Sequence, residues 1–331
     1  MELNMTNPLV YGVPLFIILI VLEIVYSEHS GKKVYWWKDT LASAAMGFGA
    51  VILGPLMKVV FAIVLFTGVY EFFNPEVDGV RQNIMGWQSF GYAWYIWLAC
   101  QFLDDFAYYW FHRANHEVRI FWAAHIVHHS SDRFNLGTGF RNGWFTILYK
   151  PFFYMWIPAL GFPVEMLLIC MGIEALWQLQ LHTKFVPKLG FLENFMNLHT
   201  QHQVHHAQNI KYLDKNHGGF LNIFDRMFGT YQPLLEDEEI EYGVIHAPNS
   251  YNPFVILTHE YADIWSDVKK AKNLKEAFMY VFGPPGWSPD GSTLTVKQMQ
   301  RDLARMEEEE RARKERAAGH NMATAKVPAG V

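Results

Sequence analysis

The sequence predicts an all-α protein: an integral-membrane helical bundle with about four to five membrane-embedded helices and a cytoplasmic, helical, histidine-rich cap for two metal ions. Two observations support this fold class. Of the 331 residues, 51% are apolar and 16% aromatic, and the long apolar runs lie before residue 182. Five histidines fall between His112 and His129, and a second cluster lies between His199 and His206. The net charge of −5 argues against a nucleic-acid partner.

The chain divides into three predicted parts. Residues 1–100 are expected to form N-terminal transmembrane spans, 101–265 a histidine-bearing catalytic domain, and 266–331 a polar C-terminal tail. The first span is Leu9–Tyr26, an apolar run long enough to cross the hydrocarbon core. No basic segment precedes it and no small-residue cleavage site follows, so it is predicted to be retained. Leu41–Tyr70 is interrupted by a Gly-Pro pair, which predicts a tilted or kinked second span.

Two further apolar segments flank the first histidine motif. Ser89–Leu103 is predicted to be a third span that runs directly into the first histidine helix. Residues 145–162 and 163–181 are predicted to form a membrane hairpin over 145–181, because a Gly-Phe-Pro sequence separates two apolar runs. A short turn is expected over Arg119–Ala124, between the first two histidine motifs. Val296–Ala318 is expected to be a charged helix.

Charges in the loops predict the orientation. Lys32, Lys33 and Lys38 follow the first span, whereas almost nothing basic precedes it, so the loop that they occupy is expected to be cytoplasmic. The N-terminus is then outside, and the histidine motifs and the C-terminal tail are cytoplasmic. The protein is expected in a cell inner membrane.

The spacing of the histidines indicates metal binding. Helical residues three and four apart share a face, and imidazole is a common ligand of iron, zinc and copper. The predicted ligands follow this spacing, apart from one lone histidine between the two clusters; they are His112, His116, His125, His128, His129, His182, His202, His205 and His206. A structural zinc site would use four ligands, usually with cysteine, but the chain has two cysteines, each in an apolar run. More histidines than one ion can use predict a two-metal site.

Several other polar residues are candidates for the surroundings of the metal ions. Asp105 shares a helical stripe with His112 and could orient an imidazole, although an ion pair with an arginine is an equal alternative. Glu174 and Gln178 lie on one stripe with His182. Asn135 lies in the polar loop Ser130–Arg141 that follows the second motif. His217 is a further candidate ligand, with an ordinary turn histidine as the favoured alternative.

These motifs resemble those of the fatty acid hydroxylase/sterol desaturase superfamily. The boxes are His112-Arg-Ala-Asn-His116, His125-Ile-Val-His128-His129 and His202-Gln-Val-His205-His206. Within the superfamily the chain is most similar to the alkylglycerol monooxygenases and their bacterial relatives, through YYWFHRANHE, HHSSDRFNL, LHT, HQVHH, DKNHGG, FDRMFGT and GPPGW. The resemblance covers about residues 101–287 and implies that 101–265 is the superfamily's catalytic domain.

The resemblance implies a di-iron oxygenase that uses O2 to hydroxylate a C–H bond of a membrane lipid, such as an ether lipid, an acyl chain or a sterol. It implies the nine histidines as iron ligands and an external electron donor, either tetrahydrobiopterin or a ferredoxin or cytochrome. The sequence departs from the family pattern at Gln178, where some relatives have histidine, and at His217, where tyrosine is expected.

Two alternatives stay open. A lipid desaturase of the same superfamily would use the same centre. A non-catalytic, histidine-rich metal-binding or transport protein is less favoured, because a transporter should distribute ionisable residues along several spans. The sequence does not indicate the oligomeric state.

Overall fold

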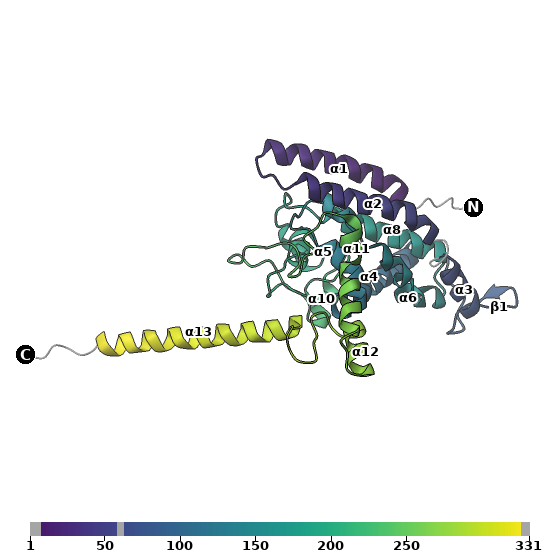
Figure 1. Ribbon diagram of the computed structural model, residues 1–331. Helices are drawn as coiled ribbons and strands as arrows, with labels where there is room; N and C mark the ends of the chain where they lie inside the picture. Colours follow the sequence, from purple (N-terminus) through teal and green to yellow (C-terminus); the bar gives the residue numbers. More distant parts are fainter. Residues whose placement is uncertain (1–7, 58–62, 326–331) are drawn as a thin grey trace, which may run out of the picture.

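A computed structural model describes residues 8–57 and 63–325 (Figure 1). The chain is mostly helical, as predicted. The N-terminal elements are α1 (Leu9–His29), α2 (Trp37–Met57), α3 (Val64–Phe73) and an antiparallel hairpin of β1 (Glu76–Val77) and β2 (Val80–Arg81). The central elements are α4 (Trp94–Glu117), α5 (Arg119–His129), α6 (Lys150–Tyr154), α7 (Trp156–Ala159), α8 (Val164–Gln180) and α9 (His199–His205), with the 3₁₀ turns η2 (Leu136–Phe140), η3 (Trp144–Leu148) and η4 (Gly190–Asn194). The last helices are α10 (Ile223–Phe228), α11 (Pro253–Val268), α12 (Leu274–Phe282) and α13 (Val296–Ala325).

Helix α1 matches the first predicted span. By length and composition it is the one helix, among the residues described, that could cross a membrane. Its apolar side chains are largely exposed, whereas Glu23 is buried and faces the protein. The Glu23 carboxylate accepts hydrogen bonds from the Leu136 amide at 2.7 Å and from the Thr183 hydroxyl at 2.5 Å. The polar group in this apolar helix therefore ties α1 to the segments on either side of the histidine site.

The second predicted span covers α2, α3 and residues 58–62, which lie outside the described part of the chain. The third predicted span does continue into the first histidine motif, because α4 is a single helix from Trp94 to Glu117. The total of four to five membrane-embedded helices stays a prediction.

The expected turn over residues 119–124 is wrong. Val118 alone is extended, with φ −121° and ψ 118°, and α5 begins at Arg119. The Arg119 amide donates to the Gly283 carbonyl at 2.9 Å, and its guanidinium binds Glu260 and Asp267. Contacts with the C-terminal part of the chain thus fix the boundary between the two helices, and no local sequence signal marks it.

The predicted hairpin over 145–181 has one continuous arm. Helix α8 forms the second arm, whereas the first is broken into η3, α6 and α7. Pro151 and Pro158 lie in these short helices, and proline cannot supply the amide that a longer helix would need. Gly161, with φ +102°, reverses the chain before α8, and such a positive φ favours glycine.

The main apolar core lies between α4, α8 and the short helices α6 and α7. Its buried members include Cys100 and Phe111 of α4, Ile157 of α7, and Met166 and Cys170 of α8. Both cysteines are free thiols in this core. Because α4 carries the first two histidines at its far end, the packing of this core sets where they lie.

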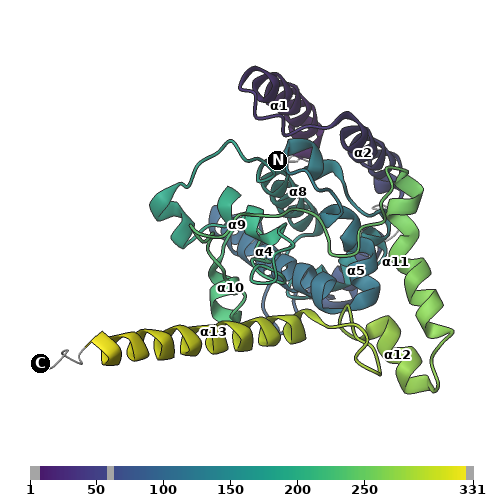
Figure 2. The same ribbon diagram turned by 60° about the vertical axis from the view of Figure 1, so that its left-hand side comes forward.

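The C-terminal helices surround the site and then leave it. Helix α11 packs on α5 and begins beside α2, and α12 also contacts α5. The predicted charged helix is confirmed as α13, which starts at Val296 and extends beyond Ala318. It projects away from the other helices in both views (Figures 1 and 2).

Candidate metal centre

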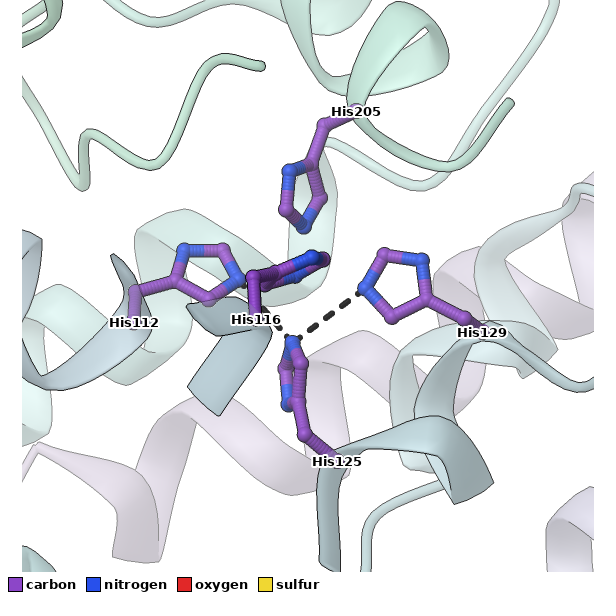
Figure 3. A group of neighbouring side chains, drawn as sticks. All are labelled: His112, His116, His125, His129 and His205. Atoms are coloured by element: carbon purple, nitrogen blue, oxygen red, sulfur yellow. Dashed lines mark hydrogen bonds between the residues drawn. The ribbon is translucent and has the colours of Figure 1, made fainter. Parts of the chain in front are cut away.

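The nine predicted histidines come together as two neighbouring groups. Within each group, one nitrogen from every ring lies within 4.8 Å of one nitrogen from each of the others. Group A consists of His112, His116, His125, His129 and His205. Group B consists of His128, His182, His202 and His206. The rings of group A converge on a common point from three segments of the chain (Figure 3).

Each HxxHH motif supplies rings to both groups. The first motif gives two rings to group A and one to group B, and the second motif does the reverse. His125 and His129 of α5 join group A, while His128 joins group B. In the second motif, at the end of α9, His205 joins group A, while His202 and His206 join group B. Neighbouring residues of a helix point about 100° apart, so His128 and His129 diverge enough to serve separate centres. The motif is therefore suited to two adjacent ions.

Backbone carbonyls fix the orientation of several rings. Because a carbonyl oxygen only accepts, a ring nitrogen facing one must carry the hydrogen. The Nδ1–H groups of four ligand candidates donate in this way: His112 to the His217 carbonyl at 3.0 Å, His128 to Arg141 at 3.2 Å, His182 to Gln178 at 2.9 Å and His205 to Lys215 at 2.9 Å. In the neutral rings the Nε2 lone pairs are then free to bind a metal ion.

The contacts between Nε2 atoms fit a bound cation in each group. In group B, His182 Nε2 lies 3.1 Å from His128 Nε2, and both rings already hold their hydrogen on Nδ1. Two lone pairs then face each other, which is unfavourable without a positive charge between them. In group A the buried Nε2 atoms of His116 and His205 have no hydrogen-bond partner. Buried polar atoms left unpaired in this way are what a metal ion would satisfy.

Burial keeps these rings neutral, as metal binding requires. All nine are buried. Burial lowers the pKa of His116 to about 3 and that of His128 to about 4. The pKa of His205 is also well below its ordinary value, first because of burial and then because of His116. Ligation by these rings nevertheless stays a prediction.

His217 lies at the edge of group A. It is fully buried, its ring centroid is 4.9 Å from that of His116, and its carbonyl accepts from His112. It does not belong to the set of mutually close nitrogens that defines group A. Its backbone thus orients a candidate ligand, and ligation by its own ring remains a prediction.

Four polar side chains were predicted to surround the metal ions: Asp105, Asn135, Glu174 and Gln178. They contact neighbouring backbone groups and one another instead of the histidine rings. Asp105 accepts from the amides of Phe220 and Leu221, and among the described residues neither a histidine ring nor an arginine is its hydrogen-bond partner. The Gln178 amide donates to Glu174 and to the Gly219 carbonyl.

Gly219 lies so close to the carboxylates of Asp105 and Glu174 that a Cβ there would clash. Asp105, Glu174 and Gln178 thus hold the segment that follows His217. Asn135 donates to the Val34 carbonyl at 3.0 Å. In the described residues, none of these four side chains bonds to a histidine ring.

Other side chains orient the histidines and were missed in the sequence. Asp214 Oδ1 lies 3.4 Å from His116 Nδ1, in group A. On the group B side, Arg141 accepts from His128 through its carbonyl and pairs through its guanidinium with Asp39 of α2; this ion pair is buried. The DKNHGG motif could have suggested Asp214. Nothing local links Asp39 to the histidines.

One cavity reaches the centre. It has a volume of about 1020 Å³, and His116, His129 and His205 of group A are among its lining residues. Trp122 and Trp287 also line it. In the part of the chain that the structure describes, no residue of group B lines this cavity. Group A is therefore the more accessible group.

A family model and several known proteins match this chain. Residues 97–230, which contain all nine histidines, match the family model described as fatty acid hydroxylase. The chain is 34% identical to alkylglycerol monooxygenase of Homo sapiens, over 86% of this chain and 61% of that protein. The superfamily assignment is confirmed. The alkylglycerol monooxygenase of Xenopus tropicalis is 31% identical over 92% of this chain and 64% of its own length.

The alkylglycerol monooxygenase of Danio rerio is 33% identical over 83% of this chain and 59% of that protein. The chain thus spans about three fifths of the length of these relatives. No solved structure matches it.

Proposed function

We propose that this protein is a membrane-bound lipid monooxygenase in which groups A and B each hold one iron ion. The observation that carries the proposal is the pair of buried histidine groups, one of them open to a cavity, within a segment that matches the fatty acid hydroxylases. The net reaction converts a C–H bond, O2, two electrons and two protons into C–OH and water. An external donor is proposed to supply the electrons.

Histidine ligands suit iron, and iron ions bound here would supply the O2 and redox chemistry. The residues of the chain hold the ligands and control access. The carbonyls of His217, Lys215, Arg141 and Gln178 keep Nδ1–H groups turned away from the centre. This leaves Nε2 facing inward without any rearrangement when an ion binds.

Aromatic side chains limit the access of water. Phe134 packs against His206 and His182 of group B, with ring centroids 5.2 and 5.7 Å apart, and it stacks on Tyr242. Trp122 lies against His116 and His129 of group A. A dry centre protects a reactive oxidant from side reactions. The cavity at group A is the proposed route for substrate, O2 or reductant.

The names of the relatives indicate oxidation of alkylglycerols and support an ether lipid as the proposed substrate. Ether lipids are therefore the first substrates to test, with acyl chains and sterols next. Tetrahydrobiopterin, a ferredoxin or a cytochrome is proposed as the electron donor. We also propose the domain division at residues 100 and 265 and the cytoplasmic placement of the histidine cap, with α1 as a span of the inner membrane.

Metal analysis of the detergent-purified protein tests the centre. The wild type should contain about two irons per chain, since two groups of four or five imidazoles each suit one ion. His202→Ala should lose the group B ion. His199→Ala is the matched control, because His199 lies on the same helix and is buried but belongs to neither group. One zinc per chain, or equal metal in both variants, would contradict the di-iron proposal.

Product analysis with ¹⁸O2 distinguishes the possible activities. A hydroxylase should give a lipid carrying one ¹⁸O atom, whereas a desaturase should give an unsaturated lipid without the label. A protein that binds two irons but changes no lipid in the presence of O2 and a reductant would favour the non-catalytic alternative.

A further inference from the structure

Helix α12 presents an apolar stripe to the outside of the protein. Leu274, Phe278 and Phe282 are spaced four residues apart and are exposed, Leu274 by 90% and Phe278 by 60%. Tyr280, on the other side, is buried against the protein and contacts Trp287. Large apolar side chains aligned on one exposed face are unusual in a soluble protein. This segment lies in the region expected to be a polar tail, so the tail is not uniformly polar.

Helix α11 continues this surface. Phe254 and Trp265 are both exposed, Trp265 by 61%. They are eleven residues apart, about three helical turns, so they lie on one side of α11. The buried residues Ile256 and Leu257 belong to the core on which α2 and α5 pack. Each helix of this pair thus has one face against the protein and large exposed apolar side chains on another, with Phe254 also touching Trp144 at the start of α11.

Lysines gather where the two helices meet. Lys269, Lys270, Lys272 and Lys275 fall within seven residues. Lys269 Nζ lies 5.1 Å from the centre of the Trp265 ring. An apolar stripe with a tryptophan and adjacent lysines is the pattern of a helix lying in a membrane interface, where lysines meet anionic headgroups.

The direction of α11 also fits an interfacial position. Helix α11 runs across the long axes of α1 and α2 (Figure 1). If α1 crosses the bilayer, a helix running across it lies along the membrane plane.

The same helix pair forms a wall of the cavity at group A. Glu260, Asp263 and Asp267 of α11 and Tyr280 of α12 line it. Arg119, at the start of α5, fixes this wall through ion pairs with Glu260 at 2.8 Å and Asp267 at 2.9 Å. One side of the pair therefore faces the cavity that reaches the histidines, and another side is apolar and exposed.

We propose that α11 and α12 lie in the membrane interface, with the apolar stripe among acyl chains and the four lysines on anionic lipid headgroups. The cavity of group A then has a wall embedded in the lipid surface. A lipid would reach the centre beside this wall without crossing water.

Fluorescence quenching tests this placement in the full chain. Leu274→Cys and Phe278→Cys would each be labelled with an environment-sensitive fluorophore, since the native cysteines are buried. Lys275→Cys, between them on α12 but exposed among the lysines, is the matched control. The proteins would be reconstituted into phosphatidylcholine vesicles with and without phosphatidylglycerol.

Labels at 274 and 278 should be blue-shifted, quenched by brominated acyl chains and protected from iodide, whereas the label at 275 should be quenched by iodide. Removing phosphatidylglycerol, or changing the four lysines to glutamine, should reduce the blue shift. Equal iodide quenching at all three positions would overturn the proposal. Protection from both quenchers would overturn it too, since a protein would then cover the stripe. These readouts do not depend on metal or turnover, so they stand apart from the proposed activity.

Discussion

Groups A and B are built from the same motifs, but they differ in how they are reached from the cavity and in which residues hold their histidines. Group A has five rings, three of which line the cavity, and its His116 faces Asp214, a half-buried carboxylate that lines the same cavity. Group B has four rings, lies behind Phe134, and is held through Arg141 and Asp39 to α2. The difference assigns separate tasks. We expect group A to meet molecules that enter through the cavity, and group B to be a fixed part of the interior.

The largest expected effect on metal content and activity comes from removing one histidine ligand, and it should depend on which group loses that ligand. His128→Ala removes one of four rings from group B, whereas His129→Ala, its neighbour, removes one of five from group A. We expect His128→Ala to lose one metal per chain and at least about 100-fold of the activity, because four ligands leave little reserve. Metal analysis and a lipid hydroxylation assay would measure both.

His129→Ala should keep more of its metal than His128→Ala, since four imidazoles remain in group A. If both variants lost the same fraction of metal, the two groups would behave as one centre, and the division into A and B would be wrong.

The second effect concerns the support of group B. Asp39→Ala leaves the buried Arg141 guanidinium without its carboxylate partner, which should destabilise the fold by about 3–5 kcal/mol. Thermal unfolding in detergent would measure this change. Asp39→Asn keeps a hydrogen-bond acceptor and should cost less. An unchanged melting temperature for Asp39→Ala would show that the ion pair does not support the site.

Much of the site could be predicted from the sequence because it is local. The spacing of His112 and His116, or of His125, His128 and His129, fixes which rings lie near one another on a helix. Their division between two groups could not be predicted, since it depends on where α9 and His182 meet α5. The roles of Asp105 and Asn135 were also not predictable. Each binds backbone amides or carbonyls of segments distant in sequence.

The fold was predictable to a similar extent. Apolar runs identified α1, α4 and α8, because long uninterrupted helices leave a clear pattern. The single-residue break at Val118 and the short helices before α8 depend on tertiary contacts and prolines, which the apolar pattern does not register.

Acid should affect the groups through the low pKa values of their histidines. In the unfolded chain a histidine has an ordinary pKa of about 6.5, whereas in the fold that of His128 is about 4. The unfolded chain therefore binds more protons below pH 6.5. Each such ring should reduce the free energy of unfolding by about 1.4 kcal/mol per pH unit, down to about pH 4 for His128. Protons also compete with metal as these rings titrate, so activity and metal content should fall as the pH drops toward about 4.

Group A should release its metal first, since protons and chelators reach it through the cavity. Metal content after incubation at pH 7.5 and at about pH 4, for the wild type and for His128→Ala, would separate the two groups. Full metal and activity at about pH 3, where His116 and His128 should be protonated, would contradict neutral histidine ligation.

The smallest expected effect concerns the residue that supports group A. Asp214→Asn keeps the size of the side chain but removes the carboxylate opposite His116 Nδ1. Loss of a carboxylate that orients a metal-binding histidine typically costs about 10–100-fold in metal affinity. We expect this loss for one of the two metals only, measured by titration with a competing chelator. Asp225→Asn cannot serve as the control, because Asp225 holds the amides of His217 and Gly218.

Asp132→Asn is the better control, since Asp132 is exposed and pairs with its neighbour Arg133. Weakening of both metals by Asp214→Asn would mean that the groups share one coupled site. If Asp214→Asn weakens one metal and Asp39→Ala weakens the other, each group has its own support. That support is a half-buried carboxylate in the cavity for group A and a buried ion pair for group B.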